Sequence, residues 1–427
     1  MFLSRGFRRN FSPNVELNMR GDFKMEKTYD VIVSGGGVAG CAAALAARRA
    51  GKTVLLIEKT LALGGLGTIG LINLFVPMDN GRGRLIIRGM CEEFVNLSRK
   101  YGWSNTSEGW EAGEPSAPTS NRYCVRYSPY FFALALLEEI ERAGVALLLD
   151  SVVSGCEREG ASLTRVIVTN KSGEEAYGAR MFIDATGDAD LCARAGVPTV
   201  QGENYFTYAA FGATLEGCAR AVETRDISRL YTTFSGGRAT LYGHNHPANM
   251  RRFSGTTGED VTDYLVRNQL EMLKSLKDDD PRSRDITTIP TMPQMRTTRR
   301  IRGVRTLTTA DVFRPAEDSV CLINDFDNRD SLYEVPLGCL VSEDADNLLA
   351  VGRAASADGY AWDVLRVIPP AILTGQAAGA AAAQAIDEKC SVRDVNIPKL
   401  QKTLEAQNVL IHMTPDLLPK DGAEGHI

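Results

Sequence analysis

Three glycines in the first tenth of the chain stand at a spacing that suits the binding of a phosphate. The stretch VIVSGGGVAGCAAALAARRAGKTVLLIEK places Gly35, Gly37 and Gly40 between an apolar, β-branched segment and an alanine-rich one. Gly35 would permit a tight turn, Gly37 would leave the backbone open to a diphosphate, and Gly40 would let a helix pack closely on a strand. The N-terminus of that helix would face the phosphate. A structural loop is the alternative, so the surrounding elements must decide.

The elements around this turn complete a dinucleotide-binding unit. We expect a buried parallel strand over 29–34, a helix over 39–50 and a second strand over 53–57. The second strand delivers Glu58, eighteen residues after Gly40, where a carboxylate can accept both hydroxyl groups of an adenosine ribose. Its negative charge also argues against a 2′-phosphate. The complete unit favours a dinucleotide site over a structural loop.

Composition limits the class of protein. The 427 residues are 44% hydrophobic and carry a formal charge of −5, so nothing in the overall charge recruits nucleic acid or an anionic membrane. No apolar run reaches the roughly 18–20 residues of a membrane span. Nine cysteines without a CxxC pair or zinc-ligand spacing predict reduced thiols, a cytoplasmic location and no metal site. Residues 1–24 are basic and polar, and we interpret them as a disordered arm or a mis-assigned start.

Further glycine-containing segments recur along the chain. The segment LGGLGT covers 63–68, and a predicted strand over 181–185 leads into the ATGD turn. A third predicted strand over 348–351 is followed by Gly-Arg and by a long helix with two prolines in its first turn. Asp188 and Asp190 either belong to a site or cap the helix that follows the ATGD turn.

The remaining elements expected in the middle of the chain are short. We predict an amphipathic helix that starts at a proline and ends before Gly144, then a strand over 145–153. Strands over 164–169 and 174–179 would form a small meander with it. The charged tract over 274–285 is expected to be a solvated loop.

In order and spacing, these motifs resemble the FAD-dependent oxidoreductases with a glutathione-reductase-like, two-dinucleotide-binding fold, and most closely a bacterial group with GGxGT, DATGD and TRRI segments. The resemblance covers residues 25 to about 385. It implies an α/β fold class, in which a Rossmann-like FAD/NAD(P)-binding domain with a parallel sheet and a β-meander carries an inserted α+β cap for the substrate. The implied FAD-binding domain is discontinuous, over 25–69, 128–195 and 342–385; the cap covers 70–127 and 196–341, and 386–427 form a C-terminal extension.

The resemblance also implies which residues contact FAD. Gly352 would approach the ribityl chain, and Arg353 stands where many relatives carry an acidic residue, which leaves diphosphate and substrate contact both open. The first turn of the last helix would place positive dipole charge near flavin N1 and O2. The cofactor residues assigned in this way are Gly35, Gly37, Val38, Ala39, Gly40, Glu58, Lys59, Gly64, Gly65, Thr68, Ala185, Thr186, Gly187, Asp188, Gly352, Arg353, Ile368, Pro369, Pro370 and Ala371.

Candidate catalytic residues come from the predicted cap. The segment MPQMRTTRRIRGVR is rich in arginine, whose fork suits a carboxylate or phosphate, and Arg299 and Arg300 are the preferred candidates. The alternative is a solvated strand whose arginines pair with nearby aspartates. His244 and His246 could each act as a general acid, although two histidines without a third ligand are also typical of a loop.

Absent motifs narrow the reaction. No CxxC follows the glycine turn, which argues against a dithiol reductase. Only one dinucleotide fingerprint exists, so NAD(P)H, if it is used, would bind transiently. We therefore predict an FAD-dependent oxidoreductase that moves two electrons, as hydride, between flavin N5 and a small organic substrate; the chain could form a homo-oligomer. A flavoenzyme of another reaction class, or a nucleotide-binding or electron-transfer subunit of a complex, remains open.

Overall fold

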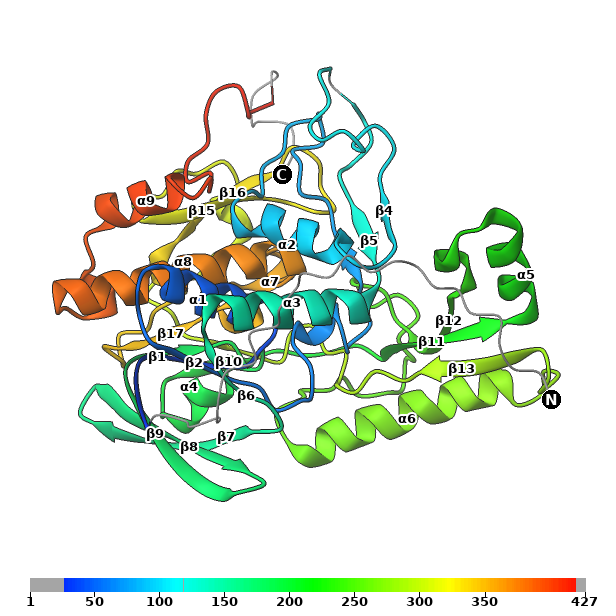
Figure 1. The fold of residues 1–427 in the computed structure, drawn as a ribbon, viewed down its shortest axis with the longest axis horizontal. Helices are drawn as coiled ribbons and strands as arrows, with labels where there is room; N and C mark the ends of the chain where they lie inside the picture. Colours follow the sequence, from blue (N-terminus) through cyan, green and yellow to red (C-terminus); the bar gives the residue numbers. More distant parts are fainter. Residues whose placement is uncertain (1–26, 118, 420–427) are drawn as a thin grey trace, which may run out of the picture.

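A parallel sheet forms the centre of the molecule. The computed structural model describes residues 27–117 and 119–419, so the prediction for residues 1–24 lies outside the described residues. Five strands run parallel in the order β6-β2-β1-β9-β17 (Figure 1). They are β1 (Thr28–Ser34), β2 (Val54–Ile57), β6 (Ala146–Leu148), β9 (Gly173–Asp184) and β17 (Leu348–Ala350). The valine, leucine and isoleucine side chains of β1 and β2 are buried, as expected of a sheet covered on both faces. The predicted Rossmann-like α/β class is confirmed.

β9 joins the parallel sheet to the meander. Its first half pairs antiparallel with β8 (Ser162–Asn170), which pairs with β7 (Val152–Glu159), while its second half runs parallel to β1. The prediction of separate strands over 174–179 and 181–185 was therefore wrong, because one continuous strand pairs with β8 in its first half and with β1 in its second. The predicted single strand over 145–153 was also wrong: it is divided into β6 and β7 at Asp150, whose φ is 50°.

Three helices cover one face of the sheet and the meander lies on the other (Figure 1). They are α1 (Val38–Arg49), α3 (Pro129–Ala143) and α8 (Ile368–Glu388). Helices α1 and α8 pack very closely, since a Cβ added at Gly375 would lie 2.1 Å from the carbonyl oxygen of Ala39. This packing fixes the N-termini of α1 and α8 near the same edge of the sheet.

The other elements form smaller sheets around this core. Strands β11, β12 and β13 form an antiparallel sheet that carries α5 and α6 at one end of the molecule (Figure 1). Helix α6 extends to Leu276, so the loop predicted over 274–285 begins with helical residues. The bounds are β3 (Leu74–Phe75), α2 (Met90–Arg99), β4 (Ser104–Thr106), β5 (Val125–Tyr127), α4 (Asp190–Arg194), β10 (Thr199–Gln201), β11 (Thr207–Thr214), α5 (Leu215–Thr224), β12 (Thr232–Arg238), α6 (Gly258–Leu276), β13 (Arg284–Thr288), β14 (Arg299–Ile301), β15 (Ser319–Asn324), β16 (Leu332–Pro336), α7 (Gly359–Leu365) and α9 (Ile397–Glu405).

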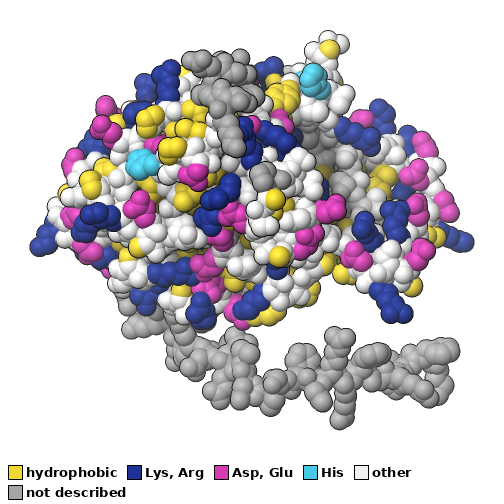
Figure 2. Space-filling model, turned by 90° about the horizontal axis from the view of Figure 1, so that it is seen from above, with side chains coloured by type: hydrophobic (Ala, Val, Ile, Leu, Met, Phe, Trp, Pro, Cys, Tyr) yellow, Lys and Arg dark blue, Asp and Glu magenta, His cyan; other side chains and the backbone are white. Residues whose placement is uncertain are grey.

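The surface carries charges of both signs. On the face shown in Figure 2, basic and acidic side chains are interspersed. Among the described residues, no helix has the length and apolar character needed to cross a membrane.

Candidate cofactor site

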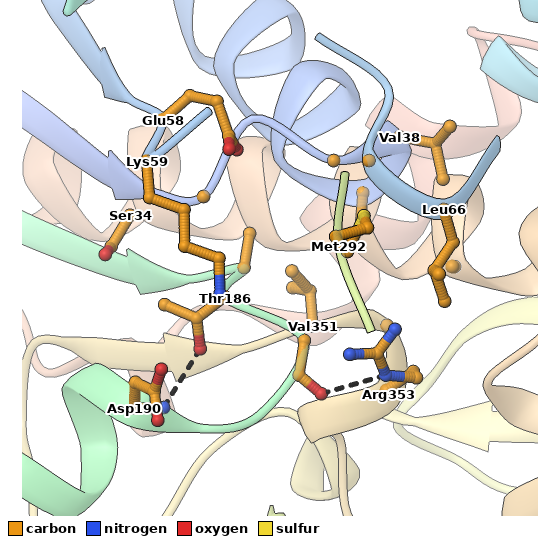
Figure 3. Close-up of a pocket in the computed structure, with 18 of the residues that line it drawn as sticks. Ser34, Val38, Glu58, Lys59, Leu66, Thr186, Asp190, Met292, Val351 and Arg353 are labelled. Atoms are coloured by element: carbon orange, nitrogen blue, oxygen red, sulfur yellow. Dashed lines mark hydrogen bonds between the residues drawn. The ribbon is translucent and has the colours of Figure 1, made fainter. Parts of the chain in front are cut away.

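A cavity opens where the carboxyl ends of the parallel strands meet (Figure 3). Its walls come from the turns after β1, β2, β6, β9 and β17 and from the start of α8. Ligands bind to open α/β sheets at this edge, because the turns there present backbone groups and helix N-termini. The cavity is therefore the candidate site.

Fifteen of the twenty predicted cofactor residues line this cavity. The lining also includes Met292 and Arg366, which were not predicted, and Ser151 to Val153, which were hidden by the misplaced boundary between β6 and β7. The five predicted residues that do not line it are Gly40, Thr68, Asp188, Pro369 and Pro370.

The glycines of the first turn have different structural roles. Gly35 has a φ of 105°, and a Cβ there would lie 2.4 Å from the carbonyl oxygen of Ala185. A Cβ at Gly40 would lie 1.8 Å from the carbonyl oxygen of Gly35, so Gly40 acts by packing α1 on the turn. A Cβ at Gly37 would meet no atom within 4 Å. Gly37 therefore leaves open a cradle at the N-terminus of α1, where N–H groups without intrahelical acceptors can bind a phosphate.

Glu58 is held in place before any ligand binds. Its Oε2 accepts the N–H of Gly36 at 2.6 Å, and its Oε1 accepts the N–H and the hydroxyl of Thr60 at 2.8 and 2.7 Å. An ionised carboxylate offers about four lone-pair sites. The Thr60 hydroxyl also lies 3.1 Å from the carbonyl oxygen of Ala62, so at least one site of Glu58 remains for a ribose hydroxyl, and the acceptance of both hydroxyls stays a prediction.

A buried aspartate that sequence reasoning missed shapes the ATGD turn. Asp184 accepts the N–H and hydroxyl of Thr186 at 3.0 and 2.7 Å, and its other oxygen accepts the N–H of Cys192 at 2.8 Å. The position of Asp184 at the end of a buried strand, directly before the turn, could have indicated this role. The alternative that Asp188 or Asp190 caps the helix was wrong, because the side chains of Thr186 and Asp184 accept the N–H groups of Asp190 and Cys192 in the first turn of α4. Burial, followed by the charges of Asp188 and Asp184, raises the pKa of Asp190.

Two arginines from other parts of the chain form hydrogen bonds with this turn. Arg353 donates to Asp188 Oδ1 at 2.9 Å and to the carbonyl of Gly187 at 3.1 Å. Arg299 donates to the carbonyl of Asp188 at 2.9 Å and to Asp190 at 2.6 Å. Arg353 lines the cavity, whereas Arg299 reaches it only through Asp190, which lines it.

The other catalytic candidates lie away from the cavity. Arg300 is buried, pairs with Asp358 at 3.1 Å and stacks over Trp362. His246 accepts the N–H of Phe206 at Nδ1 and lies 3.1 Å from the carbonyl of Met250 at Nε2, so both ring nitrogens are used. His244 is exposed on the same loop. The structure brings neither histidine nor Arg300 into the cavity lining.

The start of α8 offers few N–H donors. Pro369 and Pro370 have no N–H, and the N–H of Ala371 donates to the carbonyl of Val367. Ile368 alone among residues 368–371 keeps an N–H without an intrahelical acceptor, and Ile368 and Ala371 line the cavity. The dipole of a 21-residue helix still places positive partial charge there.

Solved structures provide distant similarities. The chain is 13% identical to p-nitrophenol 4-monooxygenase PnpA from Pseudomonas putida, with a TM-score of 0.49. The match covers 92% of this chain and 91% of the PnpA chain. A geranylgeranyl bacteriochlorophyll reductase-like protein from Thermoplasma acidophilum is 14% identical, with a TM-score of 0.39 and coverage of 92% and 94%. BexE is 15% identical, with a TM-score of 0.43 over 88% of this chain, which spans 65% of the length of BexE.

The residues present fit FAD. The open cradle at Gly37 suits a diphosphate, Glu58 keeps one site for a ribose hydroxyl, and the cavity continues to Met292 and to the start of α8. A family model described as FAD dependent oxidoreductase matches residues 30–222 and 238–404, which are most of the chain. The chain therefore belongs to the FAD dependent oxidoreductase family, and its cofactor is FAD.

Proposed function

We propose that this chain transfers two electrons between FAD and a small organic substrate that binds beneath the cap. The observation that supports the proposal best is the extent of the cavity. It runs from Glu58 and Lys59, at the nucleotide end, to Met292, which lies in the range 196–341 assigned to the cap (Figure 3). A substrate covered by the cap would thus share one continuous space with the cofactor.

The chain would contribute binding, orientation and charge. When bound, FAD supplies two-electron chemistry at flavin N5. The turn at Gly37 and the N-terminus of α1 would hold the diphosphate, while Glu58 would hold the ribose. Among the charged lining residues, Glu58, Lys59, Asp190 and Arg194 belong to the nucleotide end, and Arg353 and Arg366 are the other two. At the substrate end, the chain would therefore act mainly through fixed positive charge, which stabilises negative charge on a bound group.

The proposal also includes two finer features. The order of the GGxGT, DATGD and TRRI segments supports the glutathione-reductase-like bacterial subgroup. Nine free cysteines support a reducing, cytoplasmic location.

Anaerobic absorption spectra of the purified protein test the proposal. A flavin spectrum that bleaches on addition of NADH or NADPH would support a reductase fed by a pyridine nucleotide. A flavin spectrum that bleaches only with an organic donor would support a dehydrogenase or oxidase. A protein that stays colourless after incubation with FAD, or whose bound flavin no donor reduces, would refute the proposal.

A further inference from the structure

Helix α6 is attached to the rest of the molecule along one side. Its buried residues include Tyr264, Asn268 and Met272, which follow one another at intervals of four. The hydroxyl of Tyr264 donates to the carbonyl of Thr207 on β11, and Asn268 accepts the N–H of Gly237 on β12 at 2.9 Å. Figure 1 shows α6 along one margin of the described structure, with the sheet of β11, β12 and β13 on its inner side. The outer side of α6 therefore faces solvent.

Three apolar side chains form a stripe on this outer side. Val266, Leu270 and Leu273 follow one another at intervals of four and three residues, so they share one face of the helix. They are 49%, 59% and 59% exposed. Leu270 lies two residues from both Asn268 and Met272, which is about 160° around the helix axis from each. The stripe is therefore turned away from the core, and about half of each side chain remains in contact with solvent.

Charged residues of opposite sign stand at the two ends of the stripe. Glu259 and Asp263 precede it, and Lys274 and Lys277 follow it. Asp263 and Lys274 already contact charged groups of the same copy. Glu259 and Lys277 are exposed and make no ion pair with another described residue. A second α6 that runs in the opposite direction would place acidic residues beside basic ones, whereas a parallel one would bring like charges together.

The stripe and the outer charges share one centre. Glu259 lies nine residues before Asn268 and Lys277 lies nine after it, while Val266 lies two before and Leu270 two after. A two-fold axis that passes the helix at the level of Asn268 would bring Glu259 beside Lys277, and Val266 beside Leu270, of a second copy. Each of these contacts would occur twice, as in any two-fold interface. The outer side of α6 is thus complementary to itself.

We propose that α6 docks antiparallel on the α6 of a second copy of this chain through Val266, Leu270 and Leu273. The charge pattern favours a second copy as the partner, because it matches its own reversal. The stripe is short, and interfaces that bury less than about 1,200 Å² are weak or transient, so the dimer should depend on protein concentration. The inference is independent of the proposed function, since no residue of α6 lines the cavity.

Sedimentation velocity of the full-length, FAD-loaded protein tests the proposal. Between about 1 µM and 200 µM, a range that brackets a weak interface, the wild type should shift from monomer to dimer. Leu270→Glu should raise the dissociation constant about tenfold or more, because it places a charge beside the two-fold axis in each copy. Glutamate is a good helix former, so the exposed position should tolerate it. Val222→Glu is the matched control, since Val222 is 80% exposed on α5, and it should dimerise as the wild type does.

Charge exchange tests the orientation. Glu259→Lys or Lys277→Glu alone should weaken the dimer about threefold or more, because each removes two exposed ion pairs. The two substitutions together restore opposite charges and should recover most of the wild-type affinity. In a parallel dimer, each single substitution would exchange one like-charged pair for another and leave the affinity unchanged.

Four results would overturn the proposal. These are a wild type that stays monomeric at every concentration, a Leu270→Glu dimer as tight as that of the wild type, equal weakening by Val222→Glu, or single charge variants with wild-type affinity. The thermal midpoint and the flavin content of each variant show whether its fold is kept. If Leu270→Glu unfolds at a lower temperature than the wild type, Leu270→Gln repeats the test without an added charge.

Discussion

Replacement of Gly37 by valine separates cofactor binding from folding. The backbone at Gly37 has φ −64° and ψ 176°, which valine adopts readily, and a Cβ there meets no atom within 4 Å. The folded protein should therefore tolerate the substitution, at a cost of about 1 kcal/mol for the poorer N-cap residue. The added methyl groups would occupy the cradle at the start of α1.

The effect on FAD follows from the contacts that this cradle provides. If valine keeps the diphosphate from two backbone N–H groups, and each such bond to a charged group contributes about 1.5–3 kcal/mol, the loss is about 3–6 kcal/mol. Since about 1.4 kcal/mol corresponds to a tenfold change, FAD affinity should fall by a factor of 100 or more. The purified variant should be free of flavin.

Three measurements check this prediction: the ratio of flavin to protein absorbance, the dissociation constant for added FAD, and the thermal midpoint of the FAD-free protein. Gly258→Val is the matched control, because a Cβ at Gly258 also meets no atom within 4 Å and Gly258 lies at the start of α6, outside the cavity lining. If Gly37→Val bound FAD as tightly as Gly258→Val does, the assignment of the diphosphate to this turn would be refuted.

Two further predictions concern stability. In Gly375→Ala the new Cβ would lie 2.1 Å from a backbone carbonyl oxygen of α1, so urea unfolding should show a loss of about 1–3 kcal/mol, and an unchanged midpoint would refute the helix packing described. Burial alone would raise the pKa of Asp260, but the Gly255 N–H and Arg251 lower it overall. A carboxyl group whose pKa is lower in the folded state stabilises that state at pH values above its unfolded pKa. Asp260→Asn should therefore have a smaller free energy of unfolding than the wild type at pH 7, and the gap between the two should shrink below about pH 4. A gap that does not change with pH would contradict this.

The nucleotide half of the site could be predicted because its determinants are local. The strand, turn, helix and second strand follow one another within thirty residues, and Gly35, Gly37 and Glu58 all lie at positions that this unit specifies. The local sequence does not show how many acceptor sites are already used. Glu58 has fewer free sites than its type suggests, because Gly36 and Thr60 use most of them.

Strand boundaries were harder to predict because one strand serves two partners. Residues 173–184 are extended throughout, yet the first half belongs to an antiparallel meander and the second to a parallel sheet. No change in residue pattern marks the switch, so the division into 174–179 and 181–185 followed the apparent motif. The break at Asp150 was missed because apolar residues continue on both sides of it, so the pattern predicts one strand where there are two.

The substrate half of the site depends on which charges are already paired, and this depends on distant parts of the chain. Arg299 and Arg300 are adjacent on β14 and have the right side-chain type, but Asp190 and Asp358 pair with them. Arg296 has the same chemistry and no carboxylate partner in the described structure. An arginine that already pairs with a carboxylate must give up that contact to bind a substrate, whereas an unpaired one gains by binding. Arg296, Arg299 and Arg300 all lie outside the cavity lining, so residue type and pairing together still do not identify a substrate residue without the position of the side chain in the fold.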